Sequence, residues 1–199
     1  MTAQKTKGTK DSFFYNATIK HPTAVTQSLK CNFTYTDDTL DTNLVTVCSN
    51  LLKIYTLRDQ AITFKLNSQF NDKIVECIAI PTPNQTKRKR DIDMALDSTQ
   101  TQDYLFVLTD NFNCCLLCYN VINNKIDVVS RGCLSEKGTG ERRERPYPII
   151  VDHRFIAVML YDNVIKIIPL VHKSDSPFAV QLSNALNLRV RHSEVNDVI

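Results

Sequence analysis

Glycine is scarce in this chain, which has four glycines in 199 residues. That is about 2%, against about 7% in average proteins, and it leaves no glycine-rich loop to cradle a phosphate group. Long apolar runs are missing as well, because no stretch of about 18 apolar residues occurs, and this predicts no transmembrane helix. Residues 1–11 are rich in threonine and lysine and lack the apolar segment of a secretory signal peptide. We therefore expect a protein that stays inside the cell and has no membrane partner.

An excess of one charge is also absent from most of the chain, which has 24 basic and 21 acidic residues. The basic excess lies in two runs, which are residues 141–145 and the four bases Lys87, Arg88, Lys89 and Arg90. These runs hold seven basic and two acidic residues, so the rest has 17 basic and 19 acidic residues. Proteins that follow a nucleic-acid backbone gather positive charge on one face. The nearly neutral body therefore predicts no direct contact with DNA.

Cysteine is present in an odd number, which in an intracellular chain indicates free, buried thiols rather than disulfides. Cys115 and Cys118 have the spacing of a pair of zinc ligands, but no second pair accompanies them. They also lie in an apolar strand, where positions three apart point to opposite faces. We expect buried structural cysteines and no metal site. The seven are Cys31, Cys48, Cys77, Cys114, Cys115, Cys118 and Cys133.

The histidines do not belong to any pattern that is typical of catalysis. None lies in an HExxH motif, and the sequence has no GxSxG nucleophile turn. The sequence therefore predicts no catalytic residues and no cofactor. The four are His21, His153, His172 and His192.

Short apolar runs recur along the chain, each bounded by Asn, Asp, Ser or Pro, and they indicate a mostly β protein. Their alignment shows three copies of one pattern: strand, polar turn, strand, polar turn, alternating strand. The copies cover residues 44–66, 104–129 and 155–182. Their first turns contain Asn50, Asn111 and Asn163, where asparagine suits a positive φ. The asparagines are 61 and 52 residues apart, and periods of this size suggest β-propeller blades.

Strand composition supports blades, because the two middle strands of each copy are apolar on both faces. The third strand alternates instead, with Ile62, Phe64 and Leu66 set against Thr63 and Lys65. In a propeller, the inner strands lie between neighbouring blades, whereas the outermost strand is half exposed. The innermost strands are expected before the copies, near residues 24–33, 74–80 and 148–151. A further strand at residues 188–198 would open a fourth blade, and an extra strand at residues 13–19 precedes the first blade.

The sequence thus predicts an all-β, WD40-like β-propeller that is incomplete. We expect a disordered tail at residues 1–11 and the propeller at 12–199, with a basic loop insertion at 81–102. The blades are expected near residues 23–67, 73–131 and 147–183, and a fourth begins near 186. Because propellers close with four to eight blades, we expect the chain to be the first part of a longer polypeptide. A catalytic site at the central channel stays as an alternative, but no carboxylate or histidine cluster supports it.

The basic run in the insertion has a possible role of its own. Four consecutive bases, Lys87, Arg88, Lys89 and Arg90, match the composition of a nuclear localisation signal. An ordinary solvated loop is the alternative interpretation. With the signal active, we expect the protein in the nucleus as well as the cytoplasm.

The chain resembles the amino-terminal propeller of the large subunit of the damage-specific DNA-binding complex, the adaptor of cullin-4 ubiquitin ligases. The resemblance covers about residues 13–199. It departs from the family at the insertion around Lys87 and at ERRERPYP, residues 141–148. The stretches that carry it are YNATIKHPTAV (15–25), DYLFVLTDNFNCCLLCYN (103–120), KIDVVSRG (125–132) and RFIAVMLYDNVIKIIPL (154–170).

The resemblance implies a seven-bladed propeller that is the first of three and acts as a non-catalytic platform. In this family the first and third propellers hold WD40 substrate receptors, the second docks on cullin-4, and a partner subunit reads the DNA lesion. The cullin would therefore bind through the remainder of the protein, and no contact residues can be transferred. Two relatives share the triple-propeller plan, a splicing factor 3b subunit and the largest cleavage and polyadenylation specificity factor subunit. An RNA-processing scaffold is therefore the alternative function.

Overall fold

The computed structural model describes residues 23–36, 39–82, 102–137, 141–143, 147, 149–152, 154–172 and 180–189. These residues form strands, turns and loops but no helix, which confirms the predicted all-β class. They consequently contain no helix that could cross a membrane. The expected tail at 1–11, the expected strand at 13–19 and residues 83–101 of the insertion lie outside the described residues.

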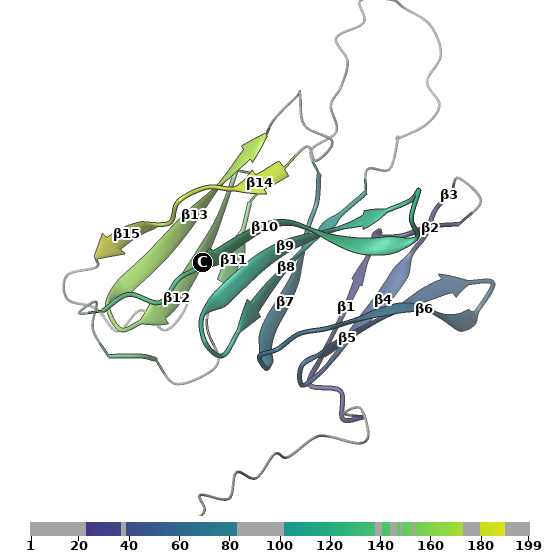
Figure 1. Ribbon diagram of the computed structural model, residues 1–199, viewed down its shortest axis with the longest axis horizontal. Coiled ribbons are helices and arrows are strands. Elements are labelled where there is room, and N and C mark those ends of the chain that lie inside the picture. Colours follow the sequence, from purple (N-terminus) through teal and green to yellow (C-terminus); the bar gives the residue numbers. More distant parts are fainter. Residues whose placement is uncertain are drawn as a thin grey trace, which may run out of the picture.

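Three antiparallel sheets lie side by side in chain order, and a small hairpin lies against the first (Figure 1). Sheet 1 contains β1 (Gln27–Cys31), β4 (Asn43–Cys48), β5 (Leu51–Arg58) and β6 (Ala61–Gln69). Sheet 2 contains β7 (Ile74–Ile80), β8 (Tyr104–Thr109), β9 (Asn113–Asn120) and β10 (Lys125–Cys133). Sheet 3 contains β11 (Ile149–Val151), β12 (Phe155–Tyr161), β13 (Val164–His172), β14 (Val180–Leu182) and β15 (Leu186–Arg189). The hairpin consists of β2 (Tyr35–Thr36) and β3 (Thr39–Leu40).

Sheet 2 is the central layer, and β8 is buried along its whole length. Alternate side chains of β8 pack into two different cores. Leu105 and Val107 pack towards sheet 1, whereas Phe106 and Leu108 pack towards sheet 3. The outer strands β6 and β10 are largely exposed. This difference in exposure between the middle and outer strands follows from the sequence, because the middle strands are apolar on both faces and the outer strands are not.

The tight turns differ from the prediction in the residue that takes a positive φ. Asn163 does so (φ 59°), but in the other two turns it is Ser49 (φ 58°) and Phe112 (φ 61°) rather than asparagine. The turn after β8 spans three residues, and the Phe112 amide donates to the Thr109 carbonyl (2.9 Å). The left-handed position therefore falls on Phe112, whose ring is fully buried against Tyr147 and Tyr161. Packing of this ring offsets a conformation that bulky residues rarely adopt.

Residues 190–198 of the strand expected to open a fourth blade lie outside the described residues, and the described part near residue 186 pairs with sheet 3. Strand β15 pairs with β13, with Leu186 opposite Ile167. The reason is that β14 pairs with only three of the nine residues of β13, so the rest of that edge would otherwise lack partners. Between β14 and β15, residues 183–185 face Ile168 and Pro169 with one residue in excess, and the Ser183 amide donates to the Pro169 carbonyl (2.9 Å). In the described residues, β14 and β15 therefore form one interrupted outer strand of sheet 3.

Strand β6 also departs from simple alternation. Its pairing with β5 is irregular at Lys65, so Leu66 pairs with Ile54 and Phe64 with Tyr55. Leu66 therefore packs on the side of sheet 2, whereas Phe64 points to the opposite side. As a result Ile62 and Phe64 are 63% and 54% exposed, although the sequence pattern grouped them with Leu66.

Candidate protein-interaction surface

The predicted basic run Lys87, Arg88, Lys89 and Arg90 lies outside the described residues. The structure does place the two ends of the insertion, because β7 ends at Ile80 and β8 begins at Tyr104. Both ends thus emerge from the same end of sheet 2.

The same end of sheets 1 and 2 carries the most irregular part of the described chain. We call it the loop surface, and define it as residues 34–36 and 39–41, the β5–β6 turn (59–60) and the β9–β10 turn (121–124). Lys65 of sheet 1 and Tyr119 of sheet 2 both reach this region: the Lys65 ammonium donates to the Tyr35 carbonyl (3.0 Å), and the Tyr119 ring lies 6.3 Å from that of Phe33. The β2–β3 hairpin is therefore anchored beside both sheets.

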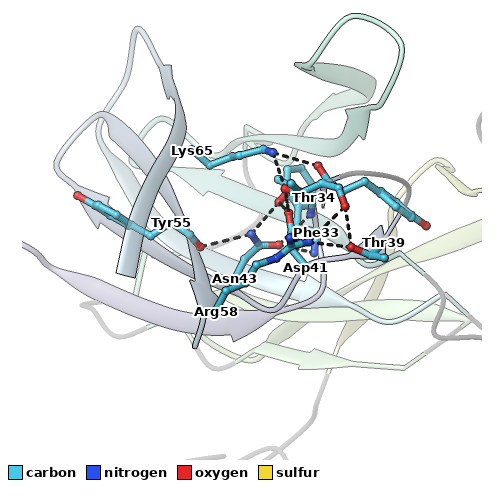
Figure 2. Close-up of polar contacts among 10 residues, drawn as sticks. Phe33, Thr34, Thr39, Asp41, Asn43, Tyr55, Arg58 and Lys65 are labelled. Carbon is cyan, nitrogen blue, oxygen red and sulfur yellow. Dashed lines mark hydrogen bonds and ion pairs between the residues drawn. The ribbon is translucent and has the colours of Figure 1, made fainter. Parts of the chain in front are cut away.

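A buried carboxylate holds the base of the hairpin in place (Figure 2). The side chain of Asp41 has no exposed surface, and its Oδ1 lies 2.6 Å from Nη2 of Arg58. Its Oδ2 accepts hydrogen bonds from the hydroxyls of Thr34 (2.9 Å) and Thr36 (2.8 Å). Arg58 also donates to the Thr39 hydroxyl (2.7 Å). A charge buried this deeply is stable only with such partners.

Asn43 satisfies the backbone where β1 leaves the sheet. Its Oδ1 accepts from the amides of Phe33 and Thr34 (both 2.8 Å), and its Nδ2 donates to the Thr34 hydroxyl (2.8 Å) and the Tyr55 carbonyl (3.3 Å). These bonds replace the ladder bonds that a regular strand would have made. The irregular segment is therefore rigid rather than loosely packed.

Sheets 1 and 2 are joined at this end by polar contacts. The Asn32 amide donates to Oδ2 of Asp103 (2.7 Å), and the Asp103 amide donates to the Asn32 carbonyl (2.7 Å). Gln102 donates to the carbonyls of Phe33 and Tyr119, both at 2.9 Å. Burial raises the pKa of Asp103, and the Asn32 amide opposes this rise. The loop surface is thus fixed to two sheets at once.

The β9–β10 turn presents two apolar side chains to solvent. Ile122 is 93% and Val121 48% exposed. Oδ1 of Asn120 accepts from the Ile122 amide (3.0 Å), and the Tyr119 hydroxyl donates to Oδ1 of Asn124 (2.7 Å). Apolar side chains on a turn that is already ordered suit recognition, because binding need not order the turn.

Sequence reasoning missed all of this surface. The network around Asp41 joins residues from three separate segments, so no local spacing could reveal it. The polar residues at 34–43 have the composition of an ordinary loop. The exposed pair Val121 and Ile122, in an otherwise polar turn, was the one signal that the sequence offered.

At the opposite end of sheets 1 and 2 lies a cleft of about 580 Å³. Asp72, Asn113, Arg131 and Cys133 contribute to its lining. Both Asp72 oxygens already accept amide hydrogen bonds, from Asn111 (2.9 Å) and Asn113 (3.0 Å). Within the described ranges, no group of three His, Cys, Asp or Glu side chains could hold a metal ion.

The cysteines are all free thiols. Cys115 packs with the core between sheets 1 and 2, whereas Cys118 belongs to the core between sheets 2 and 3, which confirms that they point to opposite faces. Cys133 is exposed, so the expectation of burial is wrong there, because it lies at the end of the outer strand β10. Burial raises the pKa of Cys115 and Cys118 to about 11, and that of Cys31 and Cys114 to about 12.

Asp41→Ala tests the anchor of the hairpin. We expect it to lower the free energy of unfolding by about 2–3 kcal/mol, because Thr34 and Thr36 lose their acceptor and Arg58 its counterion. Chemical denaturation measures this change. Arg154→Ala is the control, since the Arg154–Asp152 pair is exposed and should contribute less than about 1 kcal/mol. Equal losses in the two variants would contradict the anchoring role.

Thiol alkylation tests the burial of the cysteines. At about pH 8, iodoacetamide should modify Cys133 well before Cys115. A pKa raised by about two units lowers the thiolate fraction of Cys115 about a hundredfold, and the thiolate is the reactive form. Peptide mass spectrometry measures the order of labelling, and denatured protein, in which all seven should react, is the control. Equally fast labelling of both residues would show that Cys115 is accessible and that its environment is not the one described.

Comparison with known proteins agrees with this architecture. A family model described as the RSE1/DDB1/CPSF1 first beta-propeller matches residues 24–198. DNA damage-binding protein 1b of Arabidopsis thaliana is 25% identical over 186 residues, and DNA damage-binding protein 1a of the same plant is 24% identical over 189. The rice protein, DNA damage-binding protein 1 of Oryza sativa subsp. japonica, is 24% identical over 186 residues.

These alignments cover 92–94% of this chain but 15% of each relative. The chain thus spans about 15% of the length of the curated relatives that it matches. The predicted propeller fold and the family resemblance are both confirmed. The chain belongs to the RSE1/DDB1/CPSF1 family, in the region of its first β-propeller.

Proposed function

We propose that this chain is part of a non-catalytic adaptor that holds WD40 substrate receptors and, through the remainder of the protein, a cullin-4 scaffold. The role would be in ubiquitination during the repair of damaged DNA. The observation that carries the proposal is the loop surface, where an anchored hairpin and the exposed pair Val121 and Ile122 lie at the same end of sheets 1 and 2. The names of the relatives, which are DNA damage-binding proteins, support this choice.

Recognition by such a surface needs no catalytic group. The hydrogen bonds of Asp41 and Asn43 fix the hairpin before any partner arrives. A partner helix can then bury Val121 and Ile122, and full burial of one such side chain stabilises a complex by about 1.5–3 kcal/mol. Partner helices that lay an apolar face on a preformed surface bind in this manner.

Direct DNA binding is not part of the proposal. The body of the chain is nearly neutral outside its two basic runs, whereas phosphate binding depends on clustered lysine and arginine. We infer that a partner subunit reads the lesion and that this chain supplies protein contacts.

An RNA-processing scaffold is the second candidate. The description of the matching family model names RSE1 and CPSF1 beside DDB1, and the resemblance extends to splicing and polyadenylation scaffolds with the same triple-propeller plan. The relatives from Arabidopsis and rice are all DNA damage-binding proteins, and this favours the adaptor of the ubiquitin ligase.

Affinity purification decides between the two functions. We expect the protein, tagged at its own locus, to recover cullin-4 and WD40 receptors. The double substitution Val121→Asp and Ile122→Asp should lower receptor recovery about tenfold, because it places charges where apolar contacts form, while cullin recovery is unchanged. Val25→Asp, at another exposed apolar position (56%), is the control. Recovery of splicing or polyadenylation subunits in place of cullin-4 would establish the second candidate.

Nuclear import is a separate proposal, which rests on Lys87, Arg88, Lys89 and Arg90. Changing all four to alanine should move the tagged protein from the nucleus and cytoplasm towards the cytoplasm alone, because importins recognise such basic runs by charge. Fluorescence microscopy gives the nuclear fraction. Alanines at Lys5, Lys7 and Lys10 are the control. An unchanged nuclear fraction in the first variant would show that the run does not drive import.

A further inference from the structure

The cleft of about 580 Å³ lies between sheets 1 and 2, at the end of these sheets opposite the loop surface. The last residues of β6 and the segment after them form one wall. Leu66 packs into the core between sheets 1 and 2, and Ser68 lies on the same face because side chains two positions apart in a strand do so. Phe70 packs against this core as well. This wall therefore combines a hydroxyl group with an aromatic ring.

Strand β10 forms the opposite wall, and β9 forms the floor. Val128 pairs with Leu117, and Arg131 pairs with Cys115. Side chains that pair across two strands point to the same face of the sheet. Leu117 belongs to the core between sheets 1 and 2, and Cys115 packs against it. Val128 and Arg131 consequently face sheet 1 across the cleft.

Both walls come from sheets that the described residues supply. All lining residues lie within 68–133, so the cleft does not depend on sheets that a longer polypeptide would add beside sheet 1 or sheet 3. The wall strands β6 and β10 are the outermost strands of their sheets. Outermost strands have backbone N–H and C=O groups without a partner in the sheet, and an extended peptide can pair with such groups.

The cleft is open along β10 rather than closed over. Val128 is 40% exposed, and Arg131 and Cys133 are exposed as well. A pocket for a small molecule normally buries most of the surface of its ligand, and walls that are themselves exposed do not. They suit a chain segment that lies along the cleft and inserts an apolar side chain towards Leu117 and Val128.

Arg131 gives this cleft a positive charge. Among the residues that the structure describes, no carboxylate forms an ion pair with its guanidinium. The guanidinium does act on the floor of the cleft, because burial raises the pKa of Cys115 and the nearby Arg131 opposes this rise. The donors of a guanidinium are arranged for two hydrogen bonds to one carboxylate. Arg131 therefore favours an acidic side chain next to the apolar one.

Hydrogen bonds already order the closed end of the cleft. Asp72, the other charged lining residue, accepts at Oδ1 from the Asn111 amide (2.9 Å) and at Oδ2 from the Asn113 amide (3.0 Å) and the Thr109 hydroxyl (3.5 Å). These bonds fix the segment before β7 to the β8–β9 turn, so binding need not order it. A second carboxylate is repelled by Asp72, so the acidic residue of a bound segment belongs beside Arg131.

We propose that the cleft binds an extended segment of a partner protein in which an acidic residue adjoins an apolar one. The acidic side chain pairs with Arg131, the apolar side chain packs on Leu117 and Val128, and the backbone of the segment runs along β10. Because the cleft and the loop surface lie at opposite ends of sheets 1 and 2, this binding is independent of the proposed receptor binding, and either can fail without the other.

Selection from random peptides displayed on phage tests the cleft. The bait is the protein tagged at its own locus, purified as wild type and as the Arg131→Glu variant. We expect the wild type to enrich peptides in which aspartate or glutamate adjoins a leucine, isoleucine or phenylalanine. The variant should recover these peptides about tenfold less, because it brings like charges together. Lys125→Glu is the matched control, since it makes the same change of charge at an exposed position of β10 outside the cleft, and it should leave recovery unchanged.

Charge reversal separates a direct contact of Arg131 from a structural role. Peptides in which lysine replaces the acidic residue should bind the Arg131→Glu variant better than they bind the wild type. The proposal would be overturned if these peptides showed no such preference, or if the enriched peptides lacked an acidic residue. It would also be overturned if no peptide were enriched, or if the variant recovered the acidic peptides as well as the wild type does.

Alkylation of Cys133 is a second measurement and needs no variant. Cys133 lines the cleft and is exposed, so a saturating amount of an enriched peptide should slow its reaction with iodoacetamide about tenfold, because the reaction requires access to the thiol. The same peptide with asparagine in place of its acidic residue should protect much less. Unchanged labelling of Cys133 would place the peptide elsewhere and overturn the proposal. Protection of Cys133 without any peptide would also overturn it, since the rest of the protein would then fill the cleft.

Discussion

Everything else in this structure depends on the burial of both faces of β8. Leu105 and Val107 need sheet 1, and Phe106 and Leu108 need sheet 3, so a single six-residue strand orders three sheets into a stack. Each fully buried side chain of this kind stabilises the fold by about 1.5–3 kcal/mol. The apolar pattern continues to the two outer faces of the described stack, where Phe64 and Leu188 are 54% and 51% exposed.

Lys166 shows how a charged group is accommodated inside this apolar stack. Lys166 is fully buried in the face of sheet 3 that meets sheet 2, and its ammonium lies 2.9 Å from Oε1 of Glu136 and 3.0 Å from Oδ1 of Asn187. Asn187 in turn donates to Oε2 of Glu136 (2.7 Å). This closed ring of contacts ties β15 to the segment after β10. Together with the ladder to β13, it accounts for the position of β15 on sheet 3.

The parts that could be predicted from sequence are those set by local pattern. Periodicity along the chain predicts the all-β class and the middle strands that are buried on both faces. It also predicts the opposite directions of Cys115 and Cys118. Periodicity does not predict the pairing of β15, the left-handed backbone of Phe112 or the irregular register at Lys65. Each of these features depends on a partner elsewhere in the chain. The network around Asp41 was beyond reach for the same reason: Asp41 and Arg58 are 17 positions apart and meet only once β4 and β5 have paired.

The loop surface is held in place by residues of two neighbouring sheets. The hydrogen bonds that shape the loop surface come from Asp41, Asn43, Lys65 and Asp103, all of which belong to sheets 1 and 2 or to the segments that lead into them. The geometry presented to a partner is therefore set within two neighbouring sheets. A surface that is ordered in this manner suits recognition of another protein, because the sheets beneath it hold its loops in fixed positions.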